Sequence, residues 1–205
     1  MAWCAPLTSD YDGALRAAAQ SVEQFRGLDE PFFTALAVGS VGTLEQILGR
    51  YDDALGHLRE ADDLGGRFGI TWLTAWSRER LGTLFILRGD LPQAQALLDQ
   101  ALDLSVAARS TASVTVCLAA HARLAFAQDN PERAARLQGA AEGLRGRIGL
   151  RVWPTLRQGE AELVTQARQT LGTERFDQAF SAGSALSRRE AVAIVRNQRG
   201  VAPKG

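Results

Sequence analysis

A chain of 205 residues is long enough for one repeat array or one ordinary domain with a sizeable core. Hydrophobic residues make up 46% of it and charged residues 22%, which is typical of globular proteins and excludes a disordered chain. The 23 basic and 23 acidic side chains give a formal net charge of +0. Because proteins that hold nucleic acid through its phosphates usually carry a basic excess, we expect no direct nucleic-acid contact.

The sequence also predicts a cytoplasmic protein. No apolar run reaches the roughly 18 residues of a membrane span, so no membrane contact is expected. The first residues lack the basic and apolar regions of a signal peptide. The two cysteines, Cys4 and Cys117, lie far apart in the sequence and are interpreted as reduced thiols.

An internal repeat is the main signal in the chain. Four segments share an alanine that recurs every 40 residues, at Ala14, Ala54, Ala94 and Ala134. Further positions keep the same interval, among them Leu44, Leu84 and Leu124. Apolar residues inside the segments fall at i, i+3, i+4 and i+7, the period of an α-helix. Each 40-residue unit is therefore predicted to consist of two helices, A and B.

Helix A is expected over residues 32–48, 72–88 and 113–128, with helix B after a turn in each unit. Small Gly42 and Gly82 on helix A are expected to face Ala54 and Ala94 on helix B, which allows a close approach of the axes. Asn130 is predicted to cap a helix that begins at a proline. Only eight residues precede the first unit, too few for its helix A, so we interpret the chain as the end of a longer array.

The 40-residue pattern stops at Arg145, where a C-terminal helical cap is expected to begin. Its predicted helices cover residues 154–171, a segment capped by Thr173, and residues 191–196. Ser187 and Glu190 have the spacing of a capping box, which would open the last helix. The predicted domains are thus a repeat array over 1–144, a cap over 145–197 and a flexible tail over 198–205.

The spacing of small and apolar residues resembles that of tetratricopeptide repeats. The residues that carry this resemblance in two units are Val41, Gly42, Ala54, Leu58 and Ala61, then Leu81, Gly82, Phe85, Ala94, Leu98 and Ala101. The unit is longer than the family's roughly 34 residues, and units of this length resemble those in MalT-type regulators. The resemblance implies an all-α superhelical solenoid of helix-turn-helix hairpins with a C-terminal helical cap.

The C-terminal half carries a second resemblance, covering roughly residues 91–195. The blocks PERAARLQGAAEGLRGRIGL and LGTERFDQAFSAGSALSRREAVAIV are similar to the C-terminal part of actinobacterial LuxR- and AfsR-like ATPase transcriptional regulators. This implies a signalling or transcription-regulation context. The chain has no P-loop motif and no helix-turn-helix after Val195, so the ATPase and DNA-binding activities of such regulators are not carried over.

Helix A lines the concave groove of tetratricopeptide arrays, so its inward positions are the candidate site for a partner or effector. These positions are Leu36, Thr43, Gln46, Trp76, Glu79, Thr83, Val116, Arg123 and Phe126. Exposed Trp76 beside acidic and basic residues would suit a binding hot spot; the alternative is that Trp72 and Trp76 only pack between units. Gly39 and Glu79 occupy positions where a carboxylate clamp needs lysine, so binding of chaperone C-terminal tails is not expected.

No residue set predicts catalysis, a metal site or a cofactor. His57 precedes Glu60 by three residues, but two ligands do not make a zinc site, and we interpret His57 as an exposed helical residue. His121 is interpreted as packed rather than as a catalytic base. Asp52 and Asp53 suit the positive end of a helix dipole.

Three functions remain open at this stage. The first is a non-catalytic module that binds a protein segment or a small-molecule effector in the helix-A groove of a bacterial regulator. The second is a small-molecule pocket or enzyme built in that groove around His121 and Arg123. The third is a scaffold that self-associates into a homo-oligomer.

Overall fold

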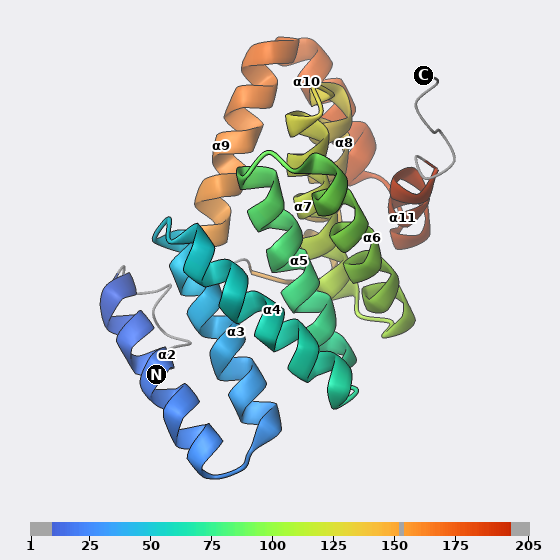
Figure 1. Cartoon of the computed structure of the whole chain (residues 1–205). Helices are drawn as coiled ribbons and strands as arrows, with labels where there is room; N and C mark the ends of the chain where they lie inside the picture. The colour runs from blue at the N-terminus through green and yellow to red at the C-terminus, as the bar shows by residue number, and fades with distance from the viewer. Residues whose placement is uncertain (1–9, 152–153, 198–205) are drawn as a thin grey trace. The chain divides into compact units, whose positions relative to one another are not determined.

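The computed structural model describes residues 10–151 and 154–197 and contains only helices and turns over these residues (Figure 1). They divide into two compact units, of which the first comprises 10–104 with 154–155 and the second 105–151 with 156–197. The expected domain boundary after residue 144 falls inside a helix, and that assignment stays a prediction. None of the described helices combines the length and apolar character needed to cross a bilayer.

Seven helices follow one another with a constant spacing. They are α2 (Tyr11–Gly27), α3 (Pro31–Ile47), α4 (Tyr51–Arg67), α5 (Thr71–Leu87), α6 (Leu91–Ala107), α7 (Thr111–Ala127) and α8 (Pro131–Ile148). Each begins 20 residues after the previous one, so two helices make one unit of the 40-residue repeat. The predicted helices A correspond to α3, α5 and α7, with ends that differ by one or two residues.

The turns between these helices share one geometry, which explains the spacing. Each turn contains one residue with a positive φ. These residues are Asp29, Gly49, Gly69, Gly89, Arg109, Asp129 and Gly149. At Gly89 the N–H groups of Gly89 and Asp90 donate to the carbonyls of Ile86 and Phe85 at 3.1 and 3.0 Å, the two bonds of a Schellman motif. Equivalent pairs of bonds close the other six turns.

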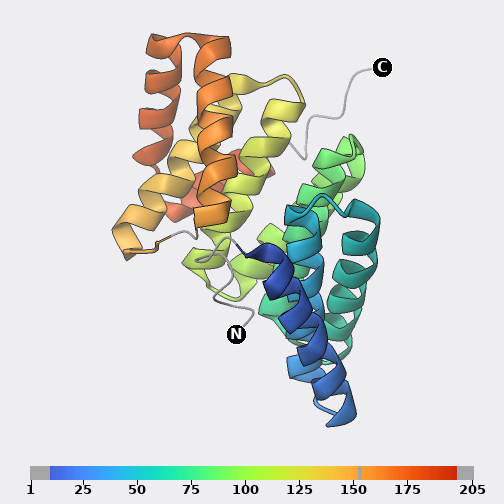
Figure 2. The ribbon, with the colours of Figure 1, turned by 90° about the vertical axis from the view of Figure 1, so that its left-hand side faces the viewer.

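Small residues set the distance between paired helices in the first unit. A Cβ placed on Gly42 would lie 2.8 Å from Leu58 Cγ and 3.2 Å from the Ala54 carbonyl oxygen. The equivalent atom on Gly82 would lie 2.6 Å from Leu98 Cγ and 3.3 Å from the Ala94 oxygen. The predicted facing of glycine and alanine is confirmed, and it explains why α3 and α4 lie close together (Figure 2).

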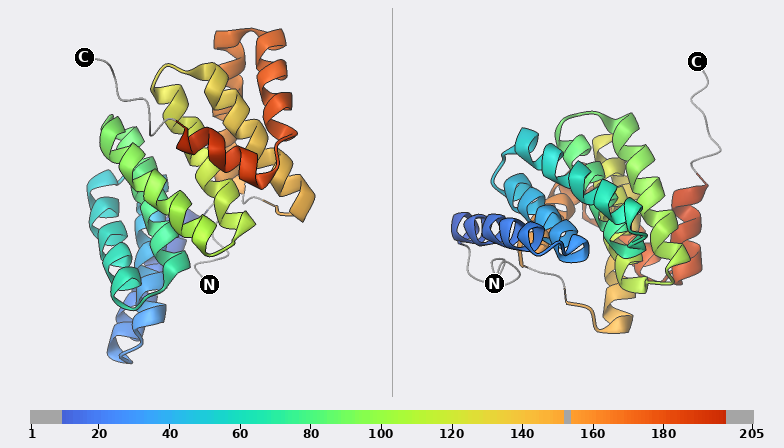
Figure 3. Two further views of the ribbon diagram at one scale, coloured as in Figure 1. Left: turned by 90° about the vertical axis from the view of Figure 1, so that its right-hand side faces the viewer. Right: turned by 60° about the horizontal axis from the view of Figure 1, so that its bottom comes forward.

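The second unit ends in three helices outside the 20-residue period: α9 (Pro154–Leu171), α10 (Thr173–Ser184) and α11 (Arg188–Arg196). Phe176 of α10 is buried against Ala135 of α8 and Ala167 of α9. Views of the C-terminal region show α9 and α10 as an antiparallel pair (Figure 2) and α11 beside α7 and α8 (Figure 3).

The helix caps test three predictions made from sequence. Asn130 accepts a hydrogen bond from the Arg133 N–H at 3.1 Å, and Ser187 and Glu190 form the complete capping box, so both predictions are confirmed. The prediction for Thr173 is wrong, because Gly172 is the N-cap and caps α10 without a side chain. Gly172 has φ +78°, which already makes Thr173 the first helical residue.

Candidate functional site

The predicted groove residues of the first unit differ in how far they reach the surface. On α3, Leu36 and Thr43 are half-buried and Gln46 is buried. The Thr43 hydroxyl donates to the Gly39 carbonyl at 2.9 Å, within its own helix. Leu36 and Thr43 therefore keep surface available for a partner, whereas Gln46 belongs to the interior.

The Trp76 ring packs against the neighbouring helix α3 and is not fully exposed to solvent. A Cβ on Gly39 would lie 2.4 Å from a ring carbon of Trp76, so the glycine makes room for the indole. The ring is half-buried as a result. This contact agrees with the alternative that Trp76 packs between repeats, and its place in a binding groove stays a prediction.

Glu79 and Thr83 lie in a buried polar cluster of α5. Two nitrogens of the Arg80 guanidinium donate to the two carboxylate oxygens of Glu79, each at 2.6 Å. The Thr83 hydroxyl donates to Glu79 Oε1 at 3.2 Å and to the Glu79 carbonyl at 3.1 Å. Because burial of a charge requires such pairing, these groups support the helix and offer little surface to a ligand.

Exposed aromatic rings gather where α3 and α5 begin. Phe32, Phe33 and Trp72 keep 39%, 45% and 43% of their surface exposed. The ring of Phe32 lies 5.1 Å from that of Phe33 and 6.2 Å from that of Trp72, centroid to centroid, both edge-on. Phe25, at the end of α2, stacks on Phe33 at 5.1 Å. We call Phe25, Phe32, Phe33 and Trp72 the aromatic patch.

The aromatic patch is unusual for a protein surface. Large rings normally bury most of their area, and contiguous exposed apolar surface marks interaction sites. Phe32 and Trp72 are 40 residues apart and take the same place in successive helices A. The inward positions of helix A predicted from sequence do not include this patch, although the 40-residue interval between Phe32 and Trp72 was a usable signal.

The predicted groove residues of α7 lie in the second unit, where the C-terminal helices approach them. Phe126 packs against the buried cluster of Ala135, Ala167, Phe176 and Ala179. A Cβ on Gly159 of α9 would lie 2.6 Å from Arg123 Nη2, so α9 passes directly over this arginine. Val116, on the same helix, is half-buried.

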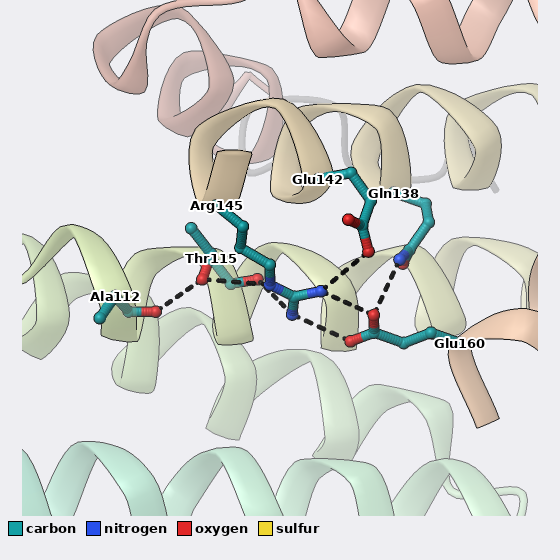
Figure 4. Close-up of polar contacts among 6 residues, drawn as sticks. All are labelled: Ala112, Thr115, Gln138, Glu142, Arg145 and Glu160. Atoms are coloured by element: carbon teal, nitrogen blue, oxygen red, sulfur yellow. Dashed lines mark hydrogen bonds and ion pairs between the residues drawn. The ribbon is translucent and has the colours of Figure 1, made fainter. Parts of the chain in front are cut away.

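A buried ion pair fastens α9 to α7 and α8 (Figure 4). Arg145 donates to the two oxygens of Glu160 at 2.6 and 2.9 Å, and both residues are buried. Gln138 donates to Glu160 Oε2 at 3.1 Å. Arg145 also approaches the hydroxyl and carbonyl of Thr115, at 3.4 and 3.5 Å, and Glu142 at 3.3 Å.

This network acts structurally, because the charges of Arg145 and Glu160 are paired with each other inside the same unit. A guanidinium fork paired with a carboxylate at two points has little freedom to rotate. It therefore fixes the direction in which α9 crosses the repeat. Sequence reasoning noted Arg145 only as the end of the repeat, since nothing in the local pattern points to Glu160.

The histidines have structural surroundings. His57 Nδ1 lies 2.7 Å from Glu45 Oε2, so its partner is on the neighbouring helix and not Glu60, and its side chain is 39% exposed. His121 is buried, which confirms the prediction of a packed residue. Over the described ranges no group of three or more His, Cys, Asp or Glu side chains has a metal-binding arrangement.

Comparison with known proteins agrees with the helical hairpins. A family model described as the tetratricopeptide repeat matches residues 33–105. This match and the regular packing of α3 to α6 show a tetratricopeptide-like helical repeat, an all-α fold. The search of curated proteins found no match.

Proposed function

We propose that the chain is a non-catalytic module that binds a segment of a partner protein on the helix-A face of its first unit. Tetratricopeptide repeats generally mediate protein–protein interaction, and the match over residues 33–105 includes Phe33, Trp72 and Trp76 of this face. The observation that carries the proposal is the aromatic patch at the start of α3 and α5.

The contact surface that we propose combines the aromatic patch with the accessible groove residues beside it. Leu36 and Trp76 each follow a ring of the patch by four residues, one helical turn, so they extend it along the same face. Aromatic side chains dominate the hot spots of protein interfaces because they bury much area with few rotatable bonds. Glu79 and Thr83 act beneath this surface as supports.

A peptide selection tests the proposal directly. A random twelve-residue display library is selected against the wild-type chain, and the selected peptides are then titrated against the double variant Phe32→Ala/Trp72→Ala. We expect their affinity to fall about tenfold or more, since loss of a hot-spot ring typically weakens binding by at least that factor.

The same two helices offer a matched control. Ile47 and Leu87 are exposed apolar residues at the opposite ends of α3 and α5, also 40 residues apart. The variant Ile47→Ala/Leu87→Ala should bind the selected peptides as the wild type does. Equal binding by all three proteins would overturn the assignment of the patch.

We infer further that the module serves a cytoplasmic signalling or transcription regulator. The ordered sequence blocks over residues 91–195, similar to the ends of LuxR- and AfsR-like regulators, support this inference. The intact gene and its neighbours test it: an adjoining P-loop ATPase or DNA-binding region is expected. An adjoining metabolic enzyme with neither region would contradict it.

Self-association is a second candidate, because an exposed aromatic patch can also bury itself against a second copy. Light scattering over a range of protein concentrations distinguishes the two functions. A mass that rises with concentration in the wild type, and stays monomeric in Phe32→Ala/Trp72→Ala, would favour the scaffold. A constant monomer mass would exclude it.

A further inference from the structure

The aromatic patch belongs to a part of the first unit that is rich in acidic residues. The two segments that carry its rings, residues 23–34 and 60–74, contain only two arginines, Arg26 and Arg67, and no lysine. Their acidic residues are Glu23, Asp29, Glu30, Glu60, Asp62 and Asp63. The surroundings of the patch are therefore negative, although the whole chain has a formal net charge of +0.

Most of these charges are already paired within the first unit. The ion pairs join Arg26 to Glu60 and Glu23, Arg67 to Asp63, and Arg78 of α5 to Asp62. Both arginines of the two segments thus have acidic partners, which leaves no unpaired positive charge there. The charge that remains for a partner protein to meet is negative.

Asp29 and Glu30 carry that remaining charge. Both are exposed and lie in the turn between α2 and α3, just before the rings of Phe32 and Phe33. Over the described part of the chain, no ion pair or side-chain hydrogen bond involves either carboxylate, and Glu30, the N-cap of α3, makes no capping bond with its side chain. The two carboxylates are free to bind a cation.

Exposed apolar side chains in the same turns border the patch. Leu28 and Phe68 are 69% and 51% exposed and take the same place in successive turns, 40 residues apart. The two turns, α2 to α3 and α4 to α5, lie at the lower end of the first unit in Figure 1. Apolar surface and unpaired carboxylates therefore occur together at this end.

We propose that the segment bound by the aromatic patch is basic, with an arginine beside a bulky apolar residue. This inference rests on the proposed function and names the chemistry of its partner. A guanidinium group can pair with a carboxylate and also stack on an aromatic face. Trp72 meets Phe32 at an interplanar angle of 63°, so that ring does not stack over the indole. Asp29 and Glu30 would then hold the charge, and the rings the apolar side chain.

The negative surroundings favour a basic peptide over a lipid surface or a second copy. Exposed rings also enter bilayer interfaces, but surfaces that bind anionic membranes place lysine and arginine beside them. In a two-fold contact between copies, Asp29 and Glu30 of both chains would lie in the same interface, where like charges repel. A basic peptide meets neither difficulty.

Fluorescence polarisation with the full chain tests the proposal. The probe is the fluorescein-labelled peptide Ser-Arg-Phe-Leu-Arg-Ser, and in the two comparison peptides both arginines are replaced by glutamine or by glutamate. We expect the basic peptide to bind about threefold or more tighter than the neutral one, the range for exposed charge pairs. The acidic peptide should bind most weakly. Raising NaCl from about 50 to about 500 mM should remove most of the difference, because salt screens exposed charges.

A pair of variants locates the charge. Asp29→Asn/Glu30→Gln should bind the basic peptide no tighter than the neutral one, with the neutral affinity unchanged. Asparagine tolerates the left-handed backbone of Asp29, which has φ +54°, so the turn is kept. The control is Asp52→Asn/Asp53→Asn, an adjacent exposed pair at the other end of α3. The 17 residues of α3 span about 26 Å, more than the screening length of about 10 Å in 0.1 M salt, so the control should keep the preference.

The ring variant separates this inference from the proposed function. Phe32→Ala/Trp72→Ala should weaken all three peptides. If it does so while the basic peptide binds no tighter than the neutral one, or while the control loses the preference as much as Asp29→Asn/Glu30→Gln does, the basic partner is overturned and the patch stands. If the ring variant binds the basic peptide as the wild type does, the patch itself is wrong. Tighter binding to phosphatidylglycerol vesicles than to the basic peptide would overturn the choice of a peptide.

Discussion

At the scale of single residues, backbone conformation decides which side chains the turns accept. Gly89 has φ +80° and Arg109 has φ +55°, at equivalent places in successive turns. A side chain in this left-handed region costs roughly 1 kcal/mol, which glycine avoids. Arginine at this position therefore lowers the stability of the fold without any visible clash.

Placing glycine at Arg109 and a non-glycine residue at Gly89 should change the free energy of unfolding in opposite directions. We expect Arg109→Gly to raise the free energy of unfolding by about 1 kcal/mol and Gly89→Ala to lower it by about the same amount. Urea denaturation measures both changes. Nothing lies within 4 Å of a Cβ built on Gly89, so a steric clash of the new methyl group cannot explain the lower free energy of unfolding of Gly89→Ala.

Gly66 provides the control for these turn variants. It is exposed and helical, and a Cβ there would also meet nothing within 4 Å. Gly66→Ala should stabilise the protein by up to about 1 kcal/mol, because alanine is the better helix former. If Gly66→Ala and Gly89→Ala shifted stability in the same direction, the role assigned to positive φ would be wrong.

The Arg145–Glu160 pair gives a second test at this scale. We expect Glu160→Ala to destabilise the chain by about 3–5 kcal/mol, because it leaves the buried guanidinium with only the partly exposed Glu142 as a counter-ion. The double variant Arg145→Leu/Glu160→Leu should lose less than Glu160→Ala alone, since no charge remains buried. Thermal or urea unfolding of the two variants and the wild type measures this. A double variant that loses as much stability as Glu160→Ala, or more, would contradict the pairing.

At the scale of elements, α11 depends on its first turn more than the long helices do. It has only nine residues, and short helices gain little from their own hydrogen bonds. Hydrogen bonds from the Ser187 side chain and backbone lower the pKa of the Glu190 carboxyl below its usual value of 4.5. The capping box thus links the stability of this element to pH.

The sign of that link follows from the lowered pKa. The stabilisation by ionised Glu190 is complete above the unfolded-state pKa, near 4.5, and is lost as pH falls through the lower folded-state value. The stability difference between wild type and Glu190→Gln should therefore shrink as pH drops from about 6 to about 3. Denaturant titrations at each pH measure it. A difference that grows towards acid pH would contradict the capping role.

At the scale of the whole molecule, most described contacts run between helices that are neighbours in the chain or one hairpin apart, and the packing of α11 on α7 and α8 is the exception. In the first unit, α3 packs on α2, α4 and α5; in the second, α8 packs on α7 and α10. Repeat proteins built in this way gain stability from their units and from nearest-neighbour interfaces. A substitution that destabilises helices of one unit should therefore leave the stability of the other unit largely unchanged.

Leu58→Ala tests this expectation. Leu58 is fully buried in the first unit, and its truncation should cost about 2–5 kcal/mol. Hydrogen-exchange mass spectrometry should show faster exchange mainly in α3, α4 and α5, with α8 and α10 protected as in the wild type. A uniform rise over both units would show that the described chain unfolds as one cooperative body.

Local sequence patterns were enough to predict the hairpin repeat and most helix ends. Alanines and leucines at a constant interval, together with turn residues such as Asn130, act through local geometry, which needs no knowledge of distant contacts. The close approach at Gly42 and Gly82 followed from the same interval. The cap at Thr173 failed because the unusual conformation of Gly172 shifts the helix start by one residue.

The packing of helices distant in the sequence sets which of these residues face solvent and which face one another. Trp76 covers Gly39, Glu79 is enclosed by Arg80 and Thr83, and Arg145 reaches Glu160 across another helix. Trp72, given less weight than Trp76, keeps the exposed ring. A helical period fixes the direction of a side chain around its own axis, whereas exposure and pairing depend on where the next helices pass.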